Sequence, residues 1–152
     1  MSRYGRAMAI TKRILRKLGQ YHEIDGEESS YGACTFASFA FYGCRAVVLQ
    51  NCNTGGMAHI LPTNDGKSHI DSLVRTSNLS VSDLRALVIA GYRPGPLIDY
   101  CREQGLTTDY VQIPGDENRV HFFSADQKDI IYRPSCAEVL LITRDHVERI
   151  RF

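Results

Sequence analysis

The chain has 152 residues, of which 43% are hydrophobic and 23% are charged. A chain of this length fits one domain that buries about 70% of its unfolded surface, so no second core is required. No apolar run approaches the 18 or more residues of a membrane span, and we therefore expect a soluble protein.

The N-terminal segment 1–22 carries most of the charge asymmetry. It holds six of the 18 basic residues and no acid, so its charge is +6, whereas the remaining 12 basic and 17 acidic residues give −5. Apolar positions recur at three- and four-residue steps, which predicts a helix with one apolar face: Ala7, Ile10 or Thr11, Ile14 and Leu18. This basic helix packs on the domain, contacts a membrane surface or a partner, or acts as a targeting signal. The acidic remainder, 23–152, reads as one domain and argues against nucleic-acid binding.

Two short strands follow a polar segment. Residues 20–33 are polar and predict a linker into a strand over 35–42. The apolar runs 46–49 and 57–61 flank a polar turn at 51–56, which is typical of a β-hairpin. If the turn is centred near Asn51 and Cys52, residues whose numbers sum to about 103 lie opposite each other.

Cys44 and His59 meet that sum. Opposed residues of antiparallel strands point to one face, with Cβ atoms roughly 4.5–5.5 Å apart. A thiol with a pKa of about 8.5 needs a neighbouring base to attack at neutral pH, and His59 can supply it. Gly43 permits a tight turn whose backbone N–H groups can line an oxyanion hole. The alternative is structural, because cysteine is often buried and a histidine in an apolar strand is often a core residue.

The downstream half predicts a sheet-rich order of the mixed α+β class. Residues 63–82 are mostly polar and predict a long loop with one helical turn around 70–75. Residues 84–90 fit either a helix or a strand by periodicity, and we favour a strand because the apolar run ends at Gly91. Residues 96–104 predict a helix that stops at Gly105. Further strands are expected at 110–113, 120–124, 129–132, 139–143 and 149–152, with a hairpin turn at 126–128.

The five cysteines include no C-x-x-C pair, which is typical of a reduced protein made in the cytoplasm rather than of a disulfide scaffold. A zinc set of Cys34, Cys44, Cys52 and His59 lacks the close cysteine pair of strong sites. We therefore expect neither a metal nor an organic cofactor.

Two motifs stand out in the segment 38–62: Gly43-Cys44 before an apolar strand, and Gly55-Gly-Met-Ala-His59-Ile-Leu-Pro62. With these motifs the segment resembles the active-site region of the chemoreceptor glutamine deamidases (the CheD family). The resemblance implies a layered sandwich of mixed strands flanked by helices, with the cysteine and the histidine on adjacent strands. The family's cysteine falls on Cys44 and its histidine on His59. Its threonine falls on Ser38, which keeps a hydroxyl. Tyr42-Gly43 stands where the family has glycine-serine. The same Cys-His pairing is also similar to that of toxin-type glutamine deamidases.

The resemblance implies hydrolysis of a protein glutamine carboxamide to a carboxylate, with release of ammonia, through a cysteine thioester. The implied substrate-binding residues are Tyr42, Gly43, Gly55 and Gly56. The implied partner is a chemoreceptor or, for an exported effector, a host protein with an exposed glutamine. A non-catalytic interaction module on the same fold and another thiol hydrolase stay open as alternatives.

Overall fold

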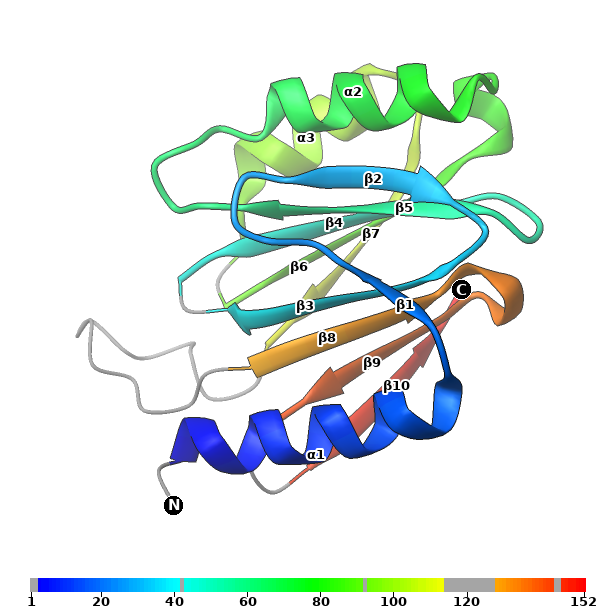
Figure 1. Cartoon of the computed structure of the whole chain (residues 1–152). Coiled ribbons are helices and arrows are strands. Elements are labelled where there is room, and N and C mark those ends of the chain that lie inside the picture. The colour runs from blue at the N-terminus through cyan, green and yellow to red at the C-terminus, as the bar shows by residue number, and fades with distance from the viewer. Residues whose placement is uncertain (1–2, 42, 92, 114–127, 144–145) are drawn as a thin grey trace.

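The computed structural model describes residues 3–41, 43–91, 93–113, 128–143 and 146–152. In this part of the chain two five-stranded sheets lie face to face, and helices cover the outer face of each sheet (Figure 1). The architecture is a layered sandwich of mixed strands flanked by helices. This confirms the expected α+β fold class.

Sheet A is the sheet covered by helix α1 (Arg3–Leu18), and its strand order is β1-β3-β8-β9-β10. β1 runs parallel to β3, and every other neighbouring pair is antiparallel. The strands are β1 (Tyr21–Glu23), β3 (Thr35–Phe41), β8 (Lys128–Arg133), β9 (Glu138–Ile142) and β10 (Val147–Arg151). A 3-10 turn, η2 (Pro134–Cys136), joins β8 to β9.

Sheet B has the strand order β2-β5-β4-β6-β7, and only β6 and β7 are parallel. Its strands are β2 (Ser29–Gly32), β4 (Arg45–Gln50), β5 (Gly55–Ile60), β6 (Arg85–Ala90) and β7 (Thr107–Gln112). Helices α2 (Lys67–Ser77) and α3 (Gly95–Glu103) cover its outer face, and a 3-10 turn, η1 (Val81–Asp83), leads into β6. The expected strand at 84–90 and helix at 96–104 are thereby confirmed as β6 and α3.

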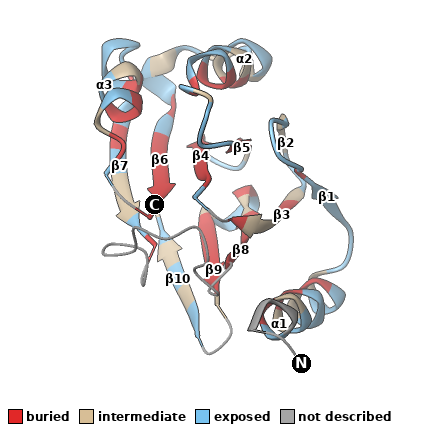
Figure 2. Cartoon of the chain, turned by 90° about the vertical axis from the view of Figure 1, so that its left-hand side faces the viewer, coloured by how far each residue is buried: buried red, intermediate tan, exposed pale blue. Residues whose placement is uncertain are grey.

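The central strand β4 shows why the chain forms layers. All six of its residues are buried, which is the pattern of a strand covered on both faces. Ala46 and Val48 join the apolar cluster between the sheets, whereas Val47 and Leu49 join the cluster under α2 and α3. Figure 2 shows the same division, because β4, β6, β8 and β9 are largely red while β1 and β10 at the edges are blue or tan.

Three local predictions fail or lie outside the description. The loop expected over 63–82 is wrong because α2 occupies 67–77; its first residue follows Gly66, which has φ 83° and no side-chain cap bond. Only His69, Ile70 and Leu73 of α2 are buried, so its sequence looks polar. The linker expected over 20–33 is also wrong, since β1 and β2 lie there as exposed or half-buried edge strands. The expected strand at 120–124 lies outside the described residues, as do residues 126 and 127 of the turn expected at 126–128, whose last residue, Lys128, begins β8.

The apolar face of helix α1 packs against the rest of the domain. Ala7, Thr11 and Leu15 are buried at four-residue steps, and the helix packs against β8 and β9. The apolar face is thus covered, and only the basic face remains available to a membrane surface or a partner. In the part of the chain that the structure describes, no helix is long and apolar enough to cross a membrane.

Candidate functional site

Ser38 sets the chemistry of its neighbour His59. It lies fully buried in β3, and its hydroxyl donates to the backbone carbonyl of Ile24 at 2.5 Å. The same Oγ lies 2.8 Å from Nδ1 of His59. A serine hydroxyl has one hydrogen, and a carbonyl can only accept, so the proton of the second contact belongs to Nδ1. The hydrogen-bond network therefore assigns neutral His59 to the Nδ1–H tautomer, with the lone pair on Nε2.

The imidazole of His59 is enclosed and is held in its neutral form by its surroundings. Its ring stacks on Phe41, with centroids 3.9 Å apart and planes 13° apart. His59 is only 4% exposed, and Nε2 has no hydrogen-bond partner among the described residues. Burial lowers the pKa of His59 from 6.5 to about 4, against the attraction of Glu27 and Asp25, which raises it. The ring is therefore neutral at neutral pH, with a buried acceptor that nothing in the described chain satisfies.

Cys44 lies on the same face as His59, one strand away. It is 7% exposed and belongs to the apolar cluster between the sheets. In the ladder of β4 and β5, Ala46 rather than Cys44 stands opposite His59. Cys44 lies just before β4 and two residues before Ala46, so it stands diagonally across from His59 on the same face.

The expected sum of paired residue numbers was too low by two because the turn is centred one residue later than expected. Gln50 pairs with Gly55, and the N–H of Asn51 donates to the carbonyl of Thr54 at 2.9 Å. The loop thus has four residues and is centred between Cys52 and Asn53. Since side chains alternate with a period of two, an even shift keeps the predicted face and changes only which residues stand directly opposite.

Glu27 binds the backbone of β5 at His59 and the residues that follow it. Its N–H donates to the carbonyl of His59 at 2.8 Å, while its carboxylate accepts from the N–H of Leu61 at 2.8 Å and from Nδ2 of Asn64 at 2.5 Å. Nε2 of His69 lies 3.2 Å from the same carboxylate. Glu27 thus fixes the segment that follows His59. The sequence gives no signal for this, because every partner is more than 30 positions away.

The expected substrate-binding residues fall into two places. Gly43, with φ 65°, directly precedes Cys44, while Tyr42 lies outside the described residues. Gly55 and Gly56 lie at the far end of β5. A Cβ at Gly55 would overlap the Tyr132 hydroxyl, and one at Gly56 would lie 2.7 Å from the Ser30 carbonyl oxygen. Close packing therefore requires both glycines.

The cysteines offer no metal centre in the part of the chain that is described. No three Cys, His, Asp or Glu side chains gather there as ligands. Cys34 and Cys52 are exposed, whereas Cys44 is buried between the sheets.

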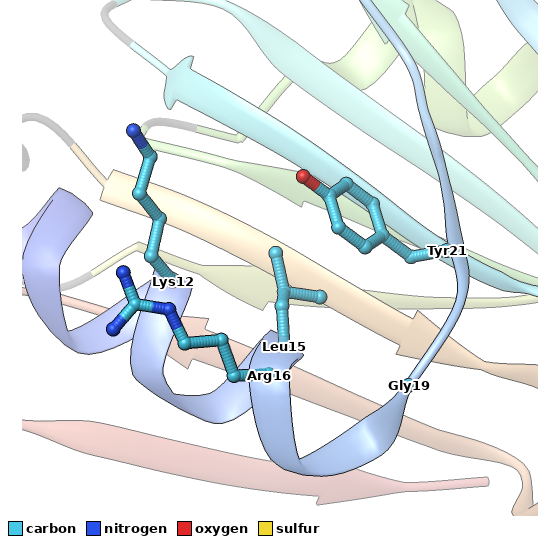
Figure 3. A pocket seen from close by; sticks show the side chains of 5 residues that line it. All are labelled: Lys12, Leu15, Arg16, Gly19 and Tyr21. Atoms are coloured by element: carbon cyan, nitrogen blue, oxygen red, sulfur yellow. The ribbon is translucent and has the colours of Figure 1, made fainter.

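A separate basic pocket of about 300 Å³ lies between α1 and β1. Figure 3 shows the side chains of Lys12, Leu15 and Arg16 on α1 and that of Tyr21 on β1 around it, with Gly19 at the turn. Both cations are exposed, and α1 contains no acid that could neutralise them. The pocket has an apolar floor and a cationic rim.

No protein-family model matches the chain, and no curated protein matches it. The solved structure of the Neisseria meningitidis protein NMB0706, of the family DUF152, is similar with a TM-score of 0.50 and 7% identity over 66% of each chain. The hypothetical protein YfiH of Bacillus licheniformis aligns with a TM-score of 0.35 and 20% identity over 41% of this chain. The chain spans 26% of the length of YfiH and 66% of that of NMB0706. The likeness to NMB0706 concerns the fold.

The expected membership of the chemoreceptor glutamine deamidases is therefore wrong, as is the broader assignment to toxin-type deamidases. The DUF152 protein NMB0706 is a solved structure of similar fold, and no family model of any kind, a deamidase family included, matches the chain. The motif behind the resemblance spans only 38–62, and its two glycines satisfy packing inside the sandwich.

Proposed function

We propose that this protein is a cysteine-dependent hydrolase that cleaves a carboxamide, with Cys44 as nucleophile and His59 as base. One observation carries the proposal: Nε2 of His59 is a buried acceptor without a partner among the described residues, on the face that also holds Cys44. Ser38 supports it by occupying Nδ1. A nucleophile, a base and a third group that orients the base form the usual arrangement of thiol hydrolases.

The low pKa of His59 decides how the thiol is activated. A neutral imidazole does not hold a resting thiolate by charge, so proton transfer accompanies the attack. The sulfur of Cys44 bonds to the carboxamide carbon as Nε2 takes the thiol proton. The imidazolium then gives this proton to the departing nitrogen, and ammonia leaves a thioester. His59 next deprotonates a water molecule that attacks the thioester, and the thiol recovers its proton.

Backbone N–H groups beside Gly43 supply the oxyanion contacts in this proposal. Its positive φ turns the chain sharply just before the nucleophile, which lets successive N–H groups converge on one point. The developing negative charge then forms next to the attacking sulfur.

The substrate proposed for this chemistry is the side-chain carboxamide of a protein glutamine. Cys44 is only 7% exposed, which favours a slender group that can reach inward, and a glutamine side chain presents its amide on a flexible two-carbon stem. The partner is then a protein with an exposed glutamine. The basic face of α1, with Lys12 and Arg16 at its pocket, is proposed to contact acidic groups of that partner.

The test is ammonia release from a glutamine-containing dipeptide and from unfolded casein, with deamidated sites mapped by mass spectrometry. The wild-type protein should convert glutamine to glutamate, and Cys44→Ala should not. Cys34→Ala and Cys52→Ala are matched controls, because they remove exposed thiols and should retain activity. Equal ammonia release from Cys44→Ala and the wild type would refute the mechanism. Transfer of the acyl group to an added amine in place of water would instead indicate a transglutaminase-like enzyme.

A further inference from the structure

A buried carboxylate, Asp129, joins three elements on the outer side of sheet A. It lies fully buried in β8, and its Oδ2 accepts a hydrogen bond at 2.7 Å from Oγ1 of Thr11 in α1. Its Oδ1 accepts from the backbone N–H of Ala40 in β3 at 3.0 Å. Burial raises the pKa of Asp129, against these two hydrogen bonds, which lower it. A buried acid is costly unless it is paired, so its position calls for a physical reason.

The reason lies in the shape of β3 at Ala40. Ala40 has φ 62°, a left-handed conformation that is unfavourable for alanine, and the pairing register of β3 with β8 shifts between Ser38 and Phe41. Three steps along β3 correspond to two along β8, which is the arrangement of a β-bulge. Asp129 accepts its hydrogen bond from the N–H of Ala40, the residue inside this bulge.

The bulge decides which side chains reach His59. In a regular strand, residues three positions apart point to opposite faces. Ser38 and Phe41 are three apart, yet Ser38 binds Nδ1 of His59 and Phe41 stacks on its ring. One strand therefore supplies both contacts only because it carries an extra residue between them.

We infer that Asp129 is a positioning residue for the proposed reaction: by holding the bulge at Ala40, it keeps Ser38 and Phe41 together on His59. The inference rests on the proposed role of His59 as the base. Asp129 lies on the opposite face of sheet A and acts through the backbone of β3. Thr11 links the basic helix α1 to the same carboxylate.

The experiment reads the imidazole of His59 by 15N NMR, which is independent of turnover. The wild-type ring should show the Nδ1–H tautomer and titrate near 4. In Asp129→Ala the bulge should relax, the ring should become wetter, and the midpoint should rise by about one unit or more toward 6.5, with a mixture of tautomers. Glu27, Asp25 and His69, which act on the charge of His59, are unchanged in every variant.

Two controls separate positioning from general packing. Asp129→Asn keeps an oxygen for the N–H of Ala40 and should preserve the tautomer and the midpoint. Thr11→Val removes the contact with α1 but leaves the contact with Ala40, so it should lower thermal stability while the His59 titration stays unchanged. A folded Asp129→Ala protein with the wild-type titration and tautomer would overturn the inference.

The double variant Asp129→Ala/Ala40→Gly covers the case in which the single variant does not fold. Glycine adopts positive φ without the steric penalty, so the bulge should form without the carboxylate and the His59 titration should return toward that of the wild type. If the double variant folds with a displaced midpoint, or if neither variant folds, Asp129 does not act through the bulge and the assignment fails. Absence of ammonia release with an intact NMR pattern would instead refute the proposed function alone.

Discussion

Lowering the pH from 7 to 4 should weaken the fold through the imidazole of His59. Burial lowers the pKa of this group from 6.5 to about 4, so in this interval the unfolded chain binds a proton that the folded chain does not. Stability must then rise with pH across the window. The contribution is complete above about 6.5 and is lost as the pH falls toward 4. A shift of this size corresponds to about 3 kcal/mol, since each unit is worth about 1.4 kcal/mol.

The measurement is urea denaturation of the wild-type protein and of His59→Gln at both pH values. The wild type should lose about 3 kcal/mol more than the variant on acidification. Asp129, whose pKa is raised, and Glu27, whose pKa is lowered, also titrate with folding, but both are present in the two proteins and cancel in the difference. Equal losses in the two proteins would mean that His59 is not held neutral by burial.

Three further outcomes follow from contacts described above. Ser38→Ala should leave Nδ1 of His59 without its acceptor, which costs about 1–3 kcal/mol of stability and shifts the ring toward a mixture of tautomers in 15N spectra; an unchanged tautomer would contradict the assignment. Gly55→Ala should cost more stability in the wild-type protein than in the Tyr132→Phe variant, because the added Cβ meets the Tyr132 hydroxyl. Equal losses in thermal denaturation would show that this overlap is relieved elsewhere. Burial raises the pKa of Cys101 to about 11, so iodoacetamide at pH 8 should label it far more slowly than the exposed cysteines in mass-spectrometric mapping, and equal labelling would contradict that burial.

Local signals in the sequence predicted the layers well. The apolar run before Gly91 predicted β6, and Pro96 with a stop at Gly105 predicted α3, because both signals are short-range. α2 was missed because it covers one side of a sheet and buries only three residues, so its apolar pattern is brief.

For the candidate site, the sequence predicted which face of the sheet carries the side chains but not which residues stand opposite each other. Alternation along β4 and β5 correctly placed Cys44 and His59 on one side, but the four-residue turn changed their register. The contacts of Phe41 and Glu27 with His59 depend on a bulge and on a segment that looked like a linker. Those contacts join residues far apart in sequence, so no local pattern encodes them.

The outer edge of β1 has a consequence for how copies of this protein meet. Within the described chain, no strand pairs with that edge, and an open strand edge invites pairing with another molecule. Lys12 and Arg16 of α1 line the pocket beside Tyr21 of β1, so two copies joined edge to edge would bring like charges together. Such repulsion would oppose self-association at this edge. Because the screening length falls from about 8 Å at 0.15 M salt to about 3 Å at 1 M, the protection is electrostatic in origin and fades in concentrated salt.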